Sequence, residues 1–262
     1  VGIINGKKNG KTIGLRADMD ALPLQEETNH EYKSKIDGVM HACGHDGHTA
    51  IGLGVADILS RHKEAIRGQI KLVFQPAEEI MSGAKRMLEE GVLEKPHVDR
   101  VLSLHMWPSL SVGKVVVQAG PIFSSVDQIQ VDVNGTGGHG GLPHLSIDPI
   151  VIAANIVTSL QTILSREIPP QQGAVLGFGT IKGGTQFNII AEQVELVGNV
   201  RTTDESIRHF VLQRVQEIST AVASGLRGEA VFHHIRGAPV LINDTDVAKL
   251  VRDVASSVIG DE

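Results

Sequence analysis

A short stretch of this chain, residues 39–49, gathers side chains that bind metal ions. It holds the only cysteine and several imidazole and carboxylate groups: His41, Cys43, His45, Asp46 and His48. One glycine separates Cys43 from His45, so in an extended loop both side chains leave the backbone on the same side, and Gly44 lets that backbone bend sharply. Thiolate and imidazole bind borderline-soft divalent metals, and a nearby carboxylate can complete or orient such a site. The spacing predicts a metal-binding loop; the alternative is a histidine-rich surface loop with a buried, inert cysteine.

Two aspartates follow a predicted strand upstream of this loop. Residues 2–4 and 12–16 are short apolar runs, and the Asn9-Gly10 turn signal between them predicts a hairpin. The second strand runs directly into Asp18 and Asp20. Open α/β sheets place their sites at the carboxyl ends of strands, so these carboxylates are expected near the site. An ordinary acidic turn is the alternative.

Two further predicted strands also end in groups that can bind a metal. Adjacent Glu78 and Glu79 follow a strand at 69–74, and His105 follows a strand at 98–104. Neighbouring residues point in different directions, so one carboxylate can hold a metal while the other takes a proton from a metal-bound water. The acidic pair alone also fits a solvated first turn of a helix, which the helix dipole favours. The recurrence at successive strand ends favours one shared site.

Composition limits the functional classes. The chain has 262 residues, 41% of them hydrophobic, and a formal net charge of -6. It can bury a sizeable core, and no run of Lys or Arg suits a nucleic acid or an anionic membrane. No apolar stretch approaches the roughly 20 residues that span a bilayer, and there is no charged-then-apolar leader. A single cysteine fits a reducing compartment, so we expect a cytoplasmic protein.

A second domain is expected after Gly120-Pro121, where the sequence changes character. Residues 127–133 alternate polar and apolar, as a strand with one wet face does, and Asp148-Pro149 predicts a helix start. The predicted order is β-α-β-β-α-β, a ferredoxin-like arrangement. Its elements are a strand at 127–133, a helix from 148 to about 165, strands at 174–181 and 192–202, a helix at 204–224 and a strand at 230–234. A further helix is expected at 247–258.

A glycine-rich loop, residues 135–144, presents His139 inside this second domain. The dinucleotide fingerprint requires a parallel βαβ context and different spacing, so we reject that interpretation. The glycines instead allow the backbone to approach a ligand or a second subunit. Asn188, after a Gly-Gly turn, and Arg201, late in a strand, are further candidates, with a polar surface residue as the default interpretation of each.

Taken together, five motifs resemble the M20 metallopeptidase/amidohydrolase family. The similarity is strongest to its branch of N-acyl-amino-acid amidohydrolases, hippurate hydrolases, indoleacetyl-amino-acid hydrolases and some carboxypeptidases. The motifs are Arg16-Ala-Asp-Met-Asp-Ala-Leu-Pro, Met40-His-Ala-Cys-Gly-His-Asp-Gly-His-Thr, Phe74-Gln-Pro-Ala-Glu-Glu, Gly137-Gly-His-Gly-Gly-Leu-Pro-His and Gly183-Gly-Thr-Gln-Phe-Asn.

The resemblance implies an α/β catalytic domain with a mixed, mainly parallel sheet flanked by helices, interrupted by a ferredoxin-like α+β dimerisation (lid) domain. We assign the catalytic domain to residues 1–119 and 238–262 and the lid to 120–237. The segments that precede Val1 and follow Glu262 in the family are expected to be missing, including a further ligand histidine, so this length is expected to bind metal weakly and to turn over substrate poorly. Ala191 also stands where the family usually has a proline.

The resemblance also assigns roles to single residues. Two divalent metals per subunit, Zn, Mn, Co or Ni, would be bound by the residues that match the family's ligands: Cys43, His45, Glu79 and His105. Glu78 matches the general base, and Asp20 the acid that orients a ligand. His139 would reach the active site of the partner subunit in a homodimer or larger oligomer and stabilise the oxyanion. Asn188 and Arg201 match residues that hold the substrate's backbone and carboxylate.

These roles predict hydrolysis of the amide bond of N-acyl amino acids or of C-terminal peptide bonds. A divalent metal lowers the pKa of bound water to around 7, Glu78 accepts the water's proton, and Arg201 grips a free carboxylate through two hydrogen bonds. Two other classes remain open. One is an amidase in which Cys43 is the nucleophile, and the other is a non-catalytic dimeric interaction protein with a vestigial site.

Overall fold

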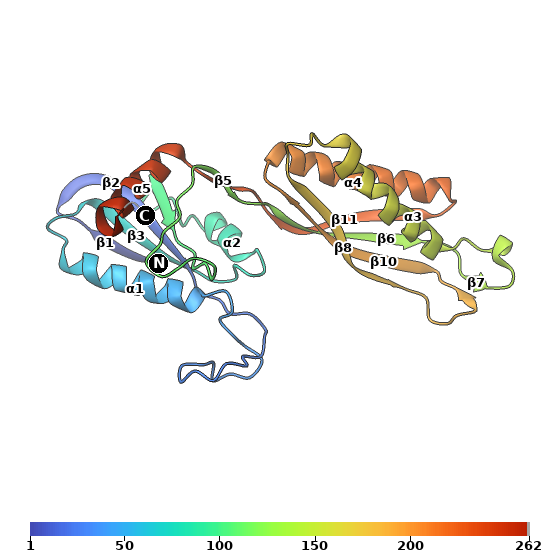
Figure 1. The fold of residues 1–262 in the computed structure, drawn as a ribbon, viewed down its shortest axis with the longest axis horizontal. Helices are drawn as coiled ribbons and strands as arrows, with labels where there is room; N and C mark the ends of the chain where they lie inside the picture. The colour runs from blue at the N-terminus through green and yellow to red at the C-terminus, as the bar shows by residue number, and fades with distance from the viewer. Residues whose placement is uncertain (261–262) are drawn as a thin grey trace. The chain divides into compact units, whose positions relative to one another are not determined.

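The computed structural model describes residues 1–260 and divides into two compact units, Val1–Val112 and a second that begins at Gly113 (Figure 1). Each unit is described by itself. The assignment of residues 238–262 to the catalytic domain stays a prediction, and its last two residues, Asp261 and Glu262, lie outside the described residues.

The first unit is built on a four-stranded mixed sheet with the order β1-β3-β2-β4. The strands are β1 (Gly2–Asn5), β2 (Lys8–Asp18), β3 (Arg67–Gln75) and β4 (Arg100–Ser103). β2 runs parallel to both β3 and β4, whereas β1 pairs antiparallel with β3. The predicted mixed, mainly parallel sheet is therefore confirmed, and the carboxyl ends of β2, β3 and β4 meet at one edge.

The predicted hairpin between the first two strands is wrong, because β3 lies between β1 and β2. Two glycines allow the backbones at the start of β2 and β3 to lie in close contact. A Cβ at Gly10 would lie 2.7 Å from the carbonyl carbon of Arg67, and one at Gly68, whose φ is +91°, would lie 2.0 Å from the Lys11 oxygen. Gly10 thus serves a close approach of two backbones rather than the tight turn that Asn-Gly usually signals.

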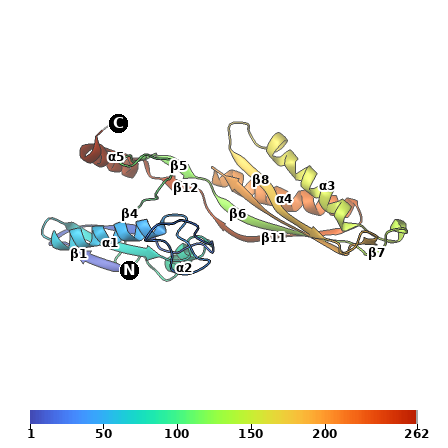
Figure 2. The same cartoon turned by 60° about the horizontal axis from the view of Figure 1, so that its bottom comes forward.

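Helix α1 (His45–Arg61) packs on β2 and β3 (Figure 2). The packing is close at Gly52, where a Cβ would lie 3.1 Å from the Phe74 ring and 3.3 Å from Cβ of Ala17. The apolar spacing of the sequence predicts a helix over residues 49–60. The observed helix begins four residues earlier and includes His45 and His48, both buried. The sequence also predicts a helix after Glu79 that Gly91 would stop. The short helix α2 (Gly83–Glu89) follows β3 and ends two residues before Gly91.

The second unit carries an antiparallel sheet with the order β11-β6-β10-β8. The expected order of elements is confirmed: β6 (Val126–Asn134), α3 (Pro149–Thr162), β8 (Ala174–Gly183), β10 (Gln193–Thr202), α4 (Glu205–Gly225) and β11 (Glu229–Ala238). Both helices cover one face of the sheet (Figure 2). β6 alternates as predicted, with Ile129, Val131 and Val133 completely buried in the core beneath the helices.

Side-chain caps explain where the helices of this unit begin. Asp148 accepts hydrogen bonds from the backbone N–H groups of Ile150 and Val151, and Asp204 caps α4 in the same way. A π-helical turn, Ile163–Glu167, continues α3.

Smaller elements complete the second unit. They are β5 (Gly120–Phe123) paired with β12 (Leu241–Asn243), β7 (Gly138–His139) paired with β9 (Ile189–Ile190), a 3-10 turn at Pro143–Leu145, and α5 (Thr245–Ile259). Within residues 1–260, no helix has both the length and the apolar character needed to cross a membrane.

Candidate metal centre

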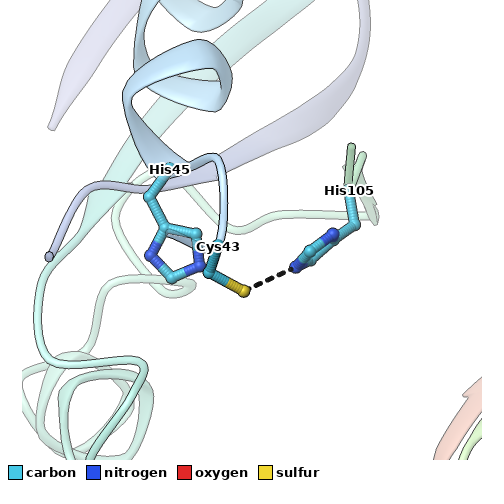
Figure 3. Close-up of side chains that lie close together, drawn as sticks. All are labelled: Cys43, His45 and His105. Atoms are coloured by element: carbon cyan, nitrogen blue, oxygen red, sulfur yellow. Dashed lines mark hydrogen bonds between the residues drawn. The ribbon is translucent and has the colours of Figure 1, made fainter. Parts of the chain in front are cut away.

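Three donor side chains from two distant segments meet at the amino end of α1 (Figure 3). Cys43 comes from the loop that enters α1, His45 is the first residue of that helix, and His105 comes from the segment after β4. Cys43 Sγ lies 3.5 Å from Nε2 of His105, and one donor atom of each residue lies within 4.8 Å of the others. Gly44, with φ +82°, makes the sharp bend that places Cys43 and His45 on the same side.

Hydrogen bonds orient both imidazoles. His45 donates from Nδ1 to the backbone oxygen of Asp20 at 2.9 Å, and His105 donates from Nδ1 to the Met106 oxygen at 2.7 Å. A carbonyl oxygen can only accept, so each Nδ1 carries the proton and each Nε2 keeps its lone pair. An imidazole that is held in this way is ready to bind a metal through Nε2.

The acidic pair lies beside His45. Donor atoms of His45, Glu78 and Glu79 fall within 4.8 Å of one another, and Nε2 of His45 lies 3.8 Å from Oε1 of Glu79. The pair is carried by a tight turn after β3, in which Ala77 and Met81 adopt positive φ angles of 54° and 55°. Such angles are strained for residues with a side chain, and strained backbone of this kind is concentrated at functional sites.

Asp20 connects the two groups of donors. Its backbone oxygen and its Oδ1, at 3.3 Å, both face Nδ1 of His45, and its Oδ2 accepts a hydrogen bond from the Glu79 backbone N–H at 3.0 Å. Burial alone would raise the pKa of Asp20, but the backbone N–H groups of Glu79 and Glu78 lower it below its ordinary value. Asp20 therefore holds the His45 imidazole through its backbone oxygen and the Glu79 backbone through its carboxylate.

Negative charge accumulates in this site. Burial, followed by the nearby carboxylates of Glu79 and Glu78, raises the pKa of Cys43 to about 11. Burial and the charge of Glu79 likewise raise the pKa of Glu78. Burial is the largest cause of both shifts and the neighbouring carboxylates add to it, so a cation bound here would lower both pKa values.

The donor set fits a divalent metal ion. Nε2 of His45 and Oε1 of Glu79 are buried and have no hydrogen-bond partner among residues 1–260. Buried polar atoms almost always have partners, so two such atoms that face each other require an explanation. A cation between them satisfies both, and a set of sulfur, nitrogen and carboxylate oxygen suits zinc and similar transition metals.

Two residues of the site had no role assigned from the sequence. Asp18 is completely buried, and its carboxylate pairs with Nη1 of Arg16 at 2.7 Å and with Nδ1 of His48 at 2.5 Å. His48 lies three residues after His45 on α1, so both rings lie on one face of the helix. In the sequence, the three-residue spacing of His45 and His48 was the feature that could have indicated that both rings lie on the buried face of the helix.

The remaining sequence-predicted residues lie in the second unit. His139 is exposed in β7, where its Nδ1 accepts a hydrogen bond from the Gly141 N–H at 2.9 Å. The loop that carries Asn188 lies beside it, since Gly140 N–H donates to the Asn188 oxygen at 2.9 Å. Arg201 is exposed near the end of β10. The structure thus brings His139 and Asn188 together, and the roles of all three residues stay predictions.

Known proteins similar to this chain include metal-binding peptidases and amide hydrolases. Residues 14–262 match the family model for peptidase family M20/M25/M40. The N-acetyl-L-cysteine deacetylase of Bacillus subtilis is 42% identical over 252 residues, which is 96% of this chain and 60% of that protein. Thermostable carboxypeptidase 1 of Saccharolobus solfataricus is 41% identical over 98% of this chain and 66% of its own length.

A solved structure has the same fold. It is a dinuclear metal binding peptidase from the M20 family of Bacillus subtilis, with a TM-score of 0.82, 35% identity, and coverage of 98% of this chain and 65% of that one. This chain therefore spans less than two thirds of the length of each of these three proteins.

Proposed function

The chain belongs to peptidase family M20/M25/M40, and from that premise we propose that it is a metal-dependent hydrolase that cleaves the amide bond of N-acyl amino acids or C-terminal peptide bonds. The observation that carries this proposal is the convergence of Cys43, His45 and His105 beside Glu78 and Glu79, with His45 common to both groups. The names of two similar proteins, a deacetylase of an N-acetyl amino acid and a carboxypeptidase, support the same substrate class.

The metal would be bound by the four predicted ligands, Cys43, His45, Glu79 and His105. Two cations per subunit are part of this proposal, and the dinuclear metal binding of the similar Bacillus subtilis peptidase supports that number. Zinc, manganese, cobalt or nickel each suits this mixture of donors. When bound, the cation supplies Lewis acidity, which brings the pKa of a coordinated water to around 7.

Glu78 acts as the general base. It lies beside Glu79 and His45 without being needed as one of the four ligands, so its carboxylate is available to accept the proton of the attacking water. Glu78 then donates this proton to the leaving amine. Burial raises its pKa, which makes it a stronger base than an exposed glutamate.

Residues of the second unit bind the substrate. Arg201 grips the free carboxylate through two parallel hydrogen bonds, and Asn188 holds the substrate's backbone. His139 of the partner subunit donates to the developing oxyanion, with this ferredoxin-like unit as the dimerising lid. The exposure of His139 and Arg201 and the adjacency of the loops of His139 and Asn188 support these assignments.

A hydrolysis screen tests the proposal. The chain is assayed on acetyl-, benzoyl- and indoleacetyl-amino acids and on short peptides, with each metal added back after chelation. Glu78→Gln is expected to retain metal and lose turnover, whereas Glu31→Gln, in an exposed loop, keeps both. Turnover that survives complete chelation would refute the metal mechanism.

The same screen separates the rival functions. A cysteine nucleophile predicts that Cys43→Ser abolishes turnover while chelators leave the wild type active. The raised pKa of Cys43 opposes that rival, since a thiol protonated at neutral pH is a weak nucleophile. A non-catalytic interaction protein predicts no turnover with any metal and substrate.

A further inference from the structure

We propose that His48 is a positioning residue of the metal centre: it connects the buried Asp18 carboxylate to the backbone of Met106 and thereby orients the imidazole of His105. The inference rests on the metal binding proposed above. It assigns a role to a histidine that is not one of the four predicted ligands.

The first step is the anchor. His48 donates from Nδ1 to Oδ1 of Asp18, and both side chains are almost completely buried. The other oxygen of Asp18 pairs with Nη1 of Arg16 at 2.7 Å. Arg16 also donates from Nε to the Gln75 side chain at 2.9 Å, at the end of β3. Asp18 is therefore fixed from two strands, and the His48 ring is fixed by Asp18.

The second step is the contact with the segment after β4. Nε2 of His48 accepts a hydrogen bond from the Met106 N–H at 2.8 Å. The same residue, Met106, accepts at its oxygen the 2.7 Å hydrogen bond from Nδ1 of His105. The His105 ring is thus hydrogen-bonded to the same residue that His48 holds, through the carbonyl group that follows the bonded N–H, and its Nε2 lies 3.5 Å from Cys43 Sγ.

The Met106 side chain adds an independent contact. It packs on the first turn of α1, where a Cβ at Gly47 would lie 2.4 Å from Met106 Sδ and one at Gly44 would lie 3.4 Å from Met106 Cβ. The segment is therefore attached to α1 by a backbone hydrogen bond to His48 and by packing on glycine. Glycine at position 47 allows the close approach that the hydrogen bond requires.

These contacts also show why His48 is not a metal ligand, although its donor atoms lie within 4.8 Å of those of Asp18 and His45. Both ring nitrogens are used, Nδ1 as donor to Asp18 and Nε2 as acceptor from Met106. A neutral imidazole has one donor and one acceptor, so no lone pair remains for a cation. Partners of this kind, which hold a ligand in place, affect metal affinity without touching the metal.

Cobalt(II) titration tests the inference. Cobalt affinity and the charge-transfer absorption of the Cys43 thiolate are measured for the wild type, His48→Leu, which removes both hydrogen bonds, and His48→Gln, whose side-chain oxygen can still accept from the Met106 N–H. We expect His48→Leu to lower cobalt affinity about 10- to 100-fold and to change the absorption band, and His48→Gln to recover part of both. His62→Leu, at the exposed end of α1, is the matched control and should bind as the wild type does.

A double-mutant cycle shows whether His48 acts through His105. In a His105→Ala background the ligand is already gone, so adding His48→Leu should cost little further affinity. Fully additive losses would overturn the inference, as would wild-type affinity and spectrum in both His48 variants. If His48→Leu fails to fold, the same test is made with His48→Gln alone and combined with His105→Ala, and additive losses in that cycle would likewise overturn the inference. Because this length is expected to bind metal weakly, the titration extends to high cobalt concentration, and a wild type that still binds none would refute the proposed function instead.

Discussion

Cys43 Sγ lies 3.5 Å from Nε2 of His105, although 62 residues separate them in sequence. The contact exists because β2 and β4 run parallel, so the chain that leaves β4 arrives at the edge of the sheet where α1 begins. Nδ1 of His105 is committed to a carbonyl oxygen, which leaves a lone pair facing a thiol. This thiol and this imidazole are two of the four donors of the proposed metal site.

Metal binding should release a proton from Cys43. Its pKa is raised to about 11, so the thiol is protonated at pH 7 and must ionise to bind a cation. Apparent affinity should therefore rise about tenfold per pH unit through the neutral range and level off as the pH approaches that pKa. Calorimetric zinc titrations in buffers of different ionisation enthalpy count the protons, and Cys43→Ser should release about one fewer than the wild type. Equal release by both proteins would contradict a thiolate ligand.

Removing the Asp20 carboxylate should weaken metal binding without unfolding the chain. Asp20→Ala keeps the backbone acceptor of His45 Nδ1 but removes the carboxylate oxygen 3.3 Å from it, and it leaves the Glu79 N–H without its side-chain partner. Affinity for zinc should fall about 10- to 100-fold, measured by competition with a chelating dye. Asp46→Ala is the control, because Asp46 belongs to the same sequence motif but is exposed on α1. An equal loss in both variants would show that charge near the loop, rather than orientation, matters.

Asp18 should make the stability of the metal-free protein depend on acid pH. Burial alone would raise its pKa, but the His48 hydrogen bond and the charge of Arg16 lower it. The pKa of an aspartate in the unfolded chain is about 3.9, and a carboxyl whose pKa is lower in the folded state stabilises the protein above that pH. This contribution is lost as the pH falls from about 3.9 through the pKa of the folded state. In denaturant unfolding, Asp18→Asn should be less stable than the wild type at pH 7, and the difference should shrink below about pH 4.

A control sharpens this measurement. Asp37→Asn, in an exposed loop, should follow the wild type at every pH. A constant difference between Asp18→Asn and the wild type down to pH 3 would show that Asp18 stabilises by shape rather than by charge.

Asp127 should dominate the stability of the second unit. Its buried carboxylate accepts from Nε of Arg208 at 2.8 Å, from Nη2 of Arg208 at 2.7 Å and from Nε2 of His234 at 2.8 Å. Asp127→Ala leaves the partly buried guanidinium of Arg208 with Glu205 as its remaining carboxylate partner, and we expect a loss of about 3 kcal/mol in the free energy of unfolding. Asp253→Ala, which breaks the exposed pair with Lys249, should cost at most about 1 kcal/mol. Similar losses in the two variants would contradict this account.

Local sequence signals predicted much of the fold because their causes are local. The alternation in β6, the capping aspartates Asp148 and Asp204 and the helical spacing after Cys43 depend on residues a few positions apart. The first helix was placed four residues late because Gly44, which bends the chain into it, also reads as a loop residue. The hairpin prediction was wrong because its cause is not local. The pairing of β1 with β3 depends on contacts of Gly10 and Gly68 with segments far along the chain.

The sequence by itself determined which donor atoms are available and that they follow the ends of strands, since residue type and strand direction are local properties. Only the tertiary structure decided which atoms meet and how each ring is turned. His48 shows the difference: its type suggests a ligand, but hydrogen bonds to Asp18 and to Met106, 58 residues away, occupy both nitrogens. Each ring is oriented by hydrogen-bond partners that lie outside the motif. The motif therefore identifies the type of chemistry, and the contacts of the folded chain decide which residue performs each role.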